Sequence, residues 1–229
     1  MRAFIRIVNQ KLCVAFALLL SMTLCVCAQE ASSQSASVSS SASAENSSEA
    51  HIPKTAKVVI HTGYGDIVMK IEVERAPITA RNFLRYVDQK RLDGMTFYRA
   101  VKIGETGEYG MLQGGIRGDP KKVLKPIPHE PTTVTGLSHI NGAVSMARLA
   151  PGSATAEFFI VLGDLISLDA QPANSGDNAG YAVFGEVIEG MDVVKTLLEL
   201  PRSESDKDGA MKGQMLKVPV KVISVRRIQ

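Results

Sequence analysis

The chain has 229 residues, of which 45% are hydrophobic, so it is long enough for one sizeable domain or two small ones. The formal net charge of +3 comes from the first 28 residues, which contain Arg2, Arg6 and Lys11 and no acidic residue. The rest of the chain balances 23 basic against 23 acidic side chains. A balanced charge lacks the basic surface that attracts nucleic acid or an anionic membrane, so we expect neither as a partner.

Residues 1–28 have the layout of a secretory signal peptide. The basic start is followed by an almost wholly apolar run over residues 12–26 and by the small residues "VCA" that a signal peptidase recognises. A run of about 15 apolar residues is short for a membrane span, which needs roughly 20. We therefore predict cleavage after Ala28 and an exported chain, either periplasmic or secreted.

The three cysteines lie in the same segment, at positions 13, 25 and 27. A chain cleaved after Ala28 therefore has no disulfide and no thiol chemistry. The alternative is a bacterial lipoprotein in which Cys27 becomes a lipidated N-terminus, and Leu24 suits that pattern while Cys25 and Val26 do not. We expect attachment to a membrane only if Cys27 is lipidated.

Residues 29–56 are rich in serine and alanine and show no apolar periodicity. Such a segment cannot bury enough surface to offset the entropy of ordering, so we predict a flexible linker. The folded part is then residues 57–229, a single domain without internal repeats.

Short apolar segments separated by turn residues dominate this folded part. Two helices are predicted, one beginning at Pro77 and one over residues 191–200 that ends before Pro201. Many short strands with two helices favour a closed antiparallel barrel whose open ends the helices cover. The predicted strands are residues 57–62, 66–73, 95–101, 111–114, 142–147, 157–162, 181–185 and 218–225.

Five segments occur in the order of a known family. They are "FYRAV" (97–101), "MLQGG" (111–115), "GAVSMAR" (142–148), "EFFIVLGD" (157–164) and "YAVFGEVIEGMDVV" (181–194). Together they resemble cyclophilin-type peptidyl-prolyl cis-trans isomerases over about residues 57–228, and "SATAEFFIVLGD" is more similar to bacterial members than to eukaryotic ones. The resemblance implies a mainly-β fold, an eight-stranded closed antiparallel β-barrel capped by two α-helices.

The activity that this resemblance implies is rotation about X–Pro peptide bonds in proline-containing polypeptides. The rotation breaks amide resonance, at a barrier of ~18–20 kcal/mol, and takes tens to hundreds of seconds uncatalysed. An apolar pocket for the proline ring and a fixed hydrogen-bond donor for the twisted amide suffice, so no cofactor or metal is expected. Arginine suits the donor role because it is always charged and rich in N–H groups.

The resemblance assigns roles to particular residues. Arg99 occupies the position of the family's catalytic arginine, and Gln113 that of a glutamine that binds the substrate backbone. Met111, Phe159 and Leu168 match positions that line the proline pocket, although any single apolar residue is more often plain barrel core. The full set of expected substrate-binding residues is Phe97, Met111, Gln113, Ala147, Glu157, Phe159, Leu168 and Tyr181.

The sequence also departs from the family pattern. Gly110 stands where members usually have phenylalanine, and we expect Tyr109 to replace that ring in the pocket. Glu157 stands where a glutamine commonly orients the catalytic arginine, so it would either hold Arg99 in a charge-assisted pair or quench its field.

Two functions of different classes therefore remain open. One is an isomerase that speeds the folding of exported proteins, and the other is a non-catalytic proline-peptide binding or chaperone module on the same barrel. The histidines at positions 51, 61, 129 and 139 lack metal-ligand spacing, and a hydrolase triad is not recognisable. We expect a monomer.

Overall fold

The computed structural model describes residues 53–105 and 107–229. The predicted signal peptide and most of the predicted linker lie outside the described residues. The first strand begins at Thr55, so Thr55 and Ala56, which the linker prediction included, already belong to the barrel. The strands are β1 Thr55–Thr62, β2 Gly65–Glu72, β3 Thr96–Ile103, β4 Tyr109–Gly115, β5 Ala143–Met146, β6 Phe158–Leu162, β7 Ala182–Glu189 and β8 Met215–Ile228.

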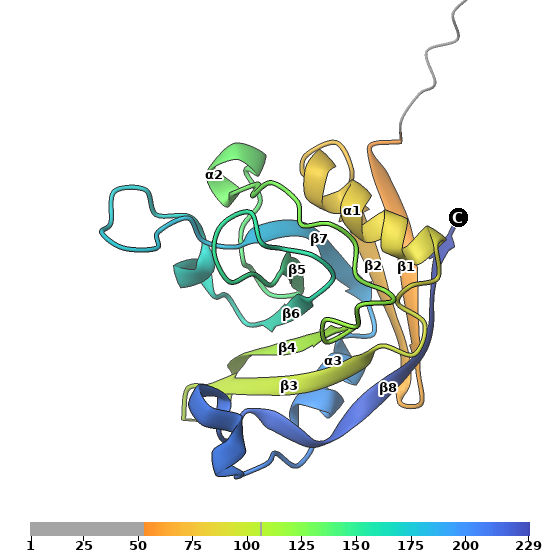
Figure 1. The fold of residues 1–229 in the computed structure, drawn as a ribbon, viewed down its shortest axis with the longest axis vertical. Coiled ribbons are helices and arrows are strands. Elements are labelled where there is room, and N and C mark those ends of the chain that lie inside the picture. Colours follow the sequence, from red (N-terminus) through yellow and green to blue (C-terminus); the bar gives the residue numbers. More distant parts are fainter. Residues whose placement is uncertain (1–52, 106) are drawn as a thin grey trace, which may run out of the picture. The chain divides into compact units, whose positions relative to one another are not determined.

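These eight strands form a closed antiparallel barrel, in the order β1-β2-β7-β5-β6-β4-β3-β8 (Figure 1). The predicted fold class is confirmed, and each predicted strand corresponds to one of the eight. Consecutive strands that share a short turn pair directly, as β1 and β2 do around Gly63 and Tyr64. Closure removes the exposed strand edges that would otherwise pair with another chain.

The two predicted helices are α1 Pro77–Asp88 and α3 Met191–Leu198, and they lie over different parts of the barrel (Figure 1). Pro77 stands at the start of α1, where its missing N–H has no helical partner to lose. A third helix, α2 Thr132–Thr135, was not predicted because four residues are too few to show a helical period. Two 3-10 turns, η1 Ile166–Leu168 and η2 Asp206–Met211, complete the elements.

Apolar side chains form two separate clusters. The main cluster fills the barrel and holds α1 and α3 against it, with Phe83 of α1 packed on Phe158 and Phe184. The second cluster lies on the other face of β5, β6 and β7 and is built around Phe159. Successive residues of a strand face opposite sides, so the pair Phe158-Phe159 contributes one ring to each cluster.

Two kinds of feature are absent from the described residues. No helix within residues 53–105 and 107–229 is long and apolar enough to cross a membrane. The same residues contain no group of three or more His, Cys, Asp or Glu side chains that could hold a metal ion.

Candidate functional site

A β-bulge in β3 determines where the polar residues of "FYRAV" point. Phe97 pairs with Gly114 of β4 and Arg99 pairs with Gln113, so Tyr98 is an extra residue between two consecutive pairs. A bulge of this kind interrupts the strict alternation of a strand. Phe97 and Ala100 are therefore buried in the main cluster, whereas Arg99 is half-buried and within reach of Gln113 and Tyr98.

The structure corrects the assignment of Phe97 to substrate binding. Its side chain is fully buried in the main cluster, edge-on to Phe158 with ring centroids 6.1 Å apart. Gly114 makes room for this ring, because a Cβ atom at Gly114 would lie 2.6 Å from Phe97 Cδ1. Phe97 is thus a core residue that supports β3 from inside the barrel.

Two glutamines hold the Arg99 guanidinium. Its Nε and Nη2 both donate to Gln214 Oε1, at 2.9 and 2.6 Å, and its Nη1 donates to Gln113 Oε1 at 3.0 Å. The backbone anchors Gln214 in this place, because the Ala100 N–H donates to the Gln214 carbonyl. Three of the five N–H groups of the arginine are used, so two remain to meet another acceptor.

Gln113 is in turn part of a longer chain of hydrogen bonds. Its Nε2 donates to the Tyr98 hydroxyl at 2.9 Å, and that hydroxyl donates to Glu157 Oε2 at 2.6 Å. Tyr98 is only 8% exposed. Burial raises the pKa of the Tyr98 hydroxyl, and the hydrogen bond to Glu157 raises it further, so the phenol stays protonated and acts as a donor to the carboxylate.

Glu157 does not hold Arg99 directly, contrary to one expectation from the sequence. Its carboxylate accepts hydrogen bonds from the Tyr98 hydroxyl and from the backbone N–H of Arg117, the latter at 2.7 Å. Within the described part of the chain no carboxylate forms an ion pair with Arg99. Tyr98 and Gln113 stand between the two charges, so the guanidinium keeps its charge available for an acceptor outside the protein.

The second apolar cluster gathers most of the residues assigned to the proline pocket. Phe159, at 3% exposed, forms its centre, and Tyr181 stands edge-on to it with ring centroids 5.5 Å apart. Met111, Leu168 and Ala147 pack against the same cluster, half-buried. Met111 and Gln113 both lie on β4, next to β3 and β6. The apolar cluster and the Arg99 group are therefore neighbours on one part of the barrel wall.

Ala147 follows the last residue of β5, and its N–H donates to the Glu157 carbonyl at 2.8 Å. The next residue, Arg148, pairs with Asp177 through two hydrogen bonds of 2.7 and 2.8 Å, and its guanidinium lies 5.1 Å from the centre of the Tyr181 ring. This pair fixes the loop that contains Asp177 beside the apolar cluster.

Tyr109 is not part of the apolar cluster. Its ring is 40% exposed and lies against Gly163, where an added Cβ atom would come within 2.4 Å of Tyr109 Cδ1. The backbone also explains the missing phenylalanine, because a Cβ atom at Gly110 would lie 2.4 Å from the Val101 carbonyl oxygen. In this arrangement position 110 accepts only glycine, and Tyr109 does not replace the ring.

Beneath the cluster lies a buried histidine to which the sequence assigned no metal-binding or catalytic role. His139 is fully buried, stacked on Phe159, and its Nδ1 lies 2.5 Å from Asp169 Oδ1 and its Nε2 lies 2.9 Å from Ser145 Oγ. The set has the composition of a hydrolase triad, but Ser145 is also fully buried and no substrate can reach it. The hydrogen bonds suit a neutral ring that donates to Asp169 and accepts from Ser145.

Acid is expected to destabilise the fold through His139. Burial lowers its pKa below the ordinary value, and the Asp169 carboxylate only partly opposes this. The unfolded state then binds more protons than the folded state as the pH falls below about 6.5, so the free energy of unfolding decreases, by at most about 1.4 kcal/mol per pH unit. Urea unfolding between pH 7.5 and 5 would measure this slope, and His139→Gln is expected to flatten it. Equal slopes in the two proteins would contradict the assignment.

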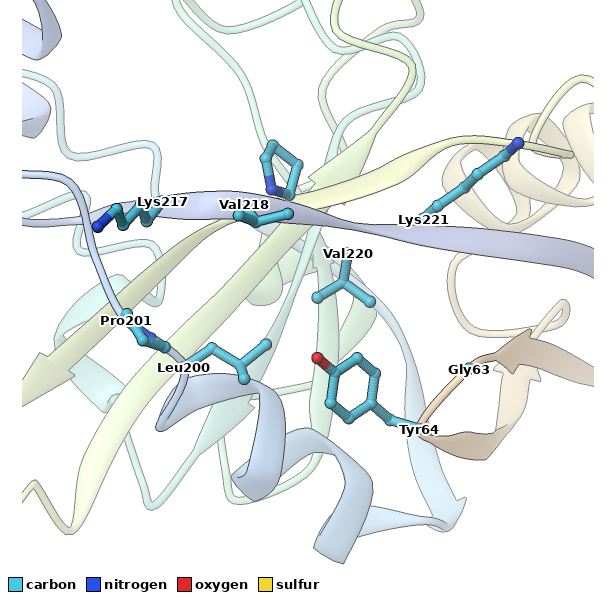
Figure 2. A pocket seen from close by; sticks show the side chains of 9 residues that line it. Gly63, Tyr64, Leu200, Pro201, Lys217, Val218, Val220 and Lys221 are labelled. Carbon is cyan, nitrogen blue, oxygen red and sulfur yellow. The ribbon is translucent and has the colours of Figure 1, made fainter.

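A separate cavity of about 500 Å³ has a lining that includes none of these residues (Figure 2). Its lining comes from the β1–β2 turn, the residues just after α3 and one stretch of β8, with the Tyr64 ring beneath that stretch. It contains none of the residues that the sequence assigned to the site. It is lined by Gly63, Tyr64, Leu200, Pro201, Lys217, Val218, Pro219, Val220 and Lys221.

Three contributors to the site were missed from the sequence. Gln214 is 115 positions from Arg99 in the chain and comes beside it only when β8 closes the barrel on β3. Tyr98 would have been expected on the face opposite Arg99, because the bulge is not visible in the sequence. Arg117, with φ at 53°, places its guanidinium 5.2 Å from the centre of the Tyr98 ring.

Comparison with known proteins identifies the family that this chain resembles. The family model described as cyclophilin type peptidyl-prolyl cis-trans isomerase/CLD matches residues 57–225. A protein of Acinetobacter baylyi named peptidyl-prolyl cis-trans isomerase is 35% identical over 178 residues, which cover 77% of this chain and 88% of that protein. Peptidyl-prolyl cis-trans isomerase B of Escherichia coli is 38% identical over 140 residues, 60% of this chain and 80% of that protein.

A solved structure shares the fold. It is the crystal structure of a Cryptosporidium parvum cyclophilin type peptidyl-prolyl cis-trans isomerase in the presence of the dipeptide Ala-Pro. The two structures have a TM-score of 0.59 at 22% identity, over 76% of this chain and 99% of that one. Since the family model spans most of the chain and the barrel matches, this chain belongs to the family of cyclophilin-type peptidyl-prolyl cis-trans isomerases.

Proposed function

We propose that the chain isomerises X–Pro bonds in exported polypeptides, with Arg99 as its electrostatic catalyst. The observation that supports this best is the environment of the Arg99 guanidinium. Two glutamines hold it, and it lies next to the apolar cluster around Phe159. Among the described residues no carboxylate forms an ion pair with it. Family membership and the names of the relatives give the activity class.

The mechanism follows from the two halves of the site. The apolar cluster holds the proline ring while the rest of the peptide rotates, and it removes water that would favour the planar, polarised amide. When the amide twists, its nitrogen regains a lone pair, and a free N–H of Arg99 donates to it. The donor is already in position, so no reorganisation is needed at the moment of reaction. No covalent intermediate forms.

The proposed substrates are proline-containing polypeptides. The Cryptosporidium relative was crystallised in the presence of Ala-Pro, and a proline ring suits the half-buried apolar surface that Met111, Leu168 and Tyr181 form around Phe159. The layout of residues 1–28 supports export, as a periplasmic protein of a bacterium or a secreted one, and lipidation at Cys27 would add a membrane anchor.

The test of activity is direct. Cis-to-trans exchange of an Ala-Pro peptide, followed by NMR, should be faster with the chain than without it. Peptide binding without faster exchange would instead make the barrel a binding module. Export is tested separately by mass spectrometry of the chain recovered from expressing bacteria: a mature N-terminus at Gln29 supports secretion, a diacylglyceryl Cys27 supports anchoring, and an intact Met1 in the cytoplasm contradicts both.

A further inference from the structure

We propose that Tyr98, held by Glu157, is a positioning residue of this isomerase. It fixes the orientation of the Gln113 side-chain amide, so that the amide oxygen faces Arg99. This inference rests on the proposed function, because it concerns how the Arg99 guanidinium is kept in its catalytic place. Nothing in the family pattern found in the sequence pointed to it, since Tyr98 lies on the same side as Arg99 only because of the bulge in β3.

The directions of the hydrogen bonds follow from what each group can do. A carboxylate only accepts hydrogen bonds, so the Tyr98 hydroxyl must donate its single proton to Glu157. The hydroxyl oxygen can then only accept from Gln113, which must present its NH₂ group to it. The other end of that amide, the oxygen, is thereby turned toward Arg99 Nη1, 3.0 Å away. The Glu157 carboxylate therefore determines the hydrogen-bond direction at Tyr98, and Tyr98 determines the orientation of the Gln113 amide.

An amide without this constraint has two orientations. Turned over, Gln113 would present its NH₂ group to the guanidinium, which has only donors, and the hydrogen bond to Arg99 would be lost. Arg99 would then be held by Gln214 alone. The remaining bonds to a single oxygen atom allow the planar guanidinium to swing, and misplacement by about 1 Å can reduce a rate 10²-fold.

The surroundings keep Glu157 in place as the acceptor. The Arg117 N–H donates to its second oxygen, and this is a backbone donor that cannot turn away. Gly115 leaves the space for the carboxylate, since a Cβ atom there would lie 2.4 Å from Glu157 Oε2. The charged groups that face Tyr98 are the Glu157 carboxylate at its hydroxyl and the Arg117 guanidinium over its ring. Both oxygens of Glu157 are therefore engaged as acceptors.

This use of both oxygens predicts that glutamine cannot replace Glu157. An amide has one acceptor oxygen, and the fixed Arg117 N–H would take it, so the NH₂ group would face Tyr98. The Tyr98 hydroxyl would then accept from residue 157 and donate its proton to Gln113, which would turn its oxygen away from Arg99. Glu157→Gln should therefore lower the rate, although it restores the residue that is common in the family at this position.

The first experiment compares Tyr98→Phe with the full-length wild-type chain in the NMR exchange assay. We expect kcat to fall about tenfold and KM to rise by less, because the apolar cluster is untouched and only the orientation of Gln113 changes. Tyr86→Phe is the matched control, since Tyr86 is also a buried tyrosine whose hydroxyl accepts one hydrogen bond, from the Leu124 N–H, outside the site. That variant should lose stability but keep its kcat.

The second experiment combines the variants. Glu157→Gln should lower kcat several-fold, and the double variant with Tyr98→Phe should be no slower than the slower single variant, because both changes break the same chain of bonds. The side-chain amide signals of Gln113 in a ¹⁵N spectrum should shift in each variant and not in Tyr86→Phe.

Two results would overturn the inference while leaving the proposed function intact. One is a folded Tyr98→Phe protein with the kcat of the wild type, and the other is a double variant whose losses multiply. If the wild-type chain did not accelerate the exchange at all, the proposed function itself would be contradicted.

Discussion

Replacing Arg99 by alanine should cost about 2–4 kcal/mol of transition-state stabilisation, the scale of one preorganised donor. This corresponds to a fall in kcat/KM of roughly 30- to 1000-fold. The loss should appear in kcat, because the donor meets the amide nitrogen only when the bond is twisted. Stability should change little, since Arg99 is half-buried and its partners are neutral glutamines.

The measurement is the same NMR exchange assay, with peptide binding followed in parallel by line broadening or calorimetry. Arg99→Lys is a useful companion, because lysine keeps the charge but cannot make the forked contact with Gln214 and Gln113. It should recover only a small part of the rate. A variant Arg99→Ala that binds and exchanges peptide like the wild type would refute the catalytic role.

Replacing Phe159 by alanine should remove the centre of the apolar surface that receives proline. We expect peptide affinity to fall by up to roughly 1.5–3 kcal/mol, because the bound proline ring would lose much of the apolar floor that shields it from water. KM should therefore rise, in contrast to the effect of Arg99→Ala on kcat. Phe159 is itself buried, so this variant should also lose stability, but the main cluster inside the barrel does not contain Phe159 and the fold should survive below a lowered melting temperature.

Phe184→Ala provides the matched control, since Phe184 belongs to the main cluster and packs on Phe83 with ring centroids 5.0 Å apart. Its loss should reduce the free energy of unfolding by about 3–5 kcal/mol, the usual range for a buried phenylalanine. Below its melting temperature this variant should keep the peptide affinity of the wild type. If the two variants lost affinity equally, the division into a binding cluster and a core cluster would be wrong.

Much of the fold could be predicted from the chain itself. Short apolar runs between turn residues, with clear alternation in β2, marked the eight strands, and the helical spacing after Pro77 marked α1. These signals are local, because side-chain alternation and turn geometry depend only on neighbouring residues. The positions of Arg99, Gln113 and Phe159 in recognisable motifs also indicated where the chemistry would lie.

The sequence by itself determined the strands and the family, since each can be recognised from local motifs, and the family resemblance in turn predicted the barrel and the central residues. The tertiary structure decided which side chains share a face and what holds them. The bulge at Tyr98 directs the Phe97 side chain into the core, and barrel closure places Gln214 beside Arg99. The partner of Glu157 was decided in the same way, because a hydrogen bond depends on distances of about 3 Å between residues far apart in the chain.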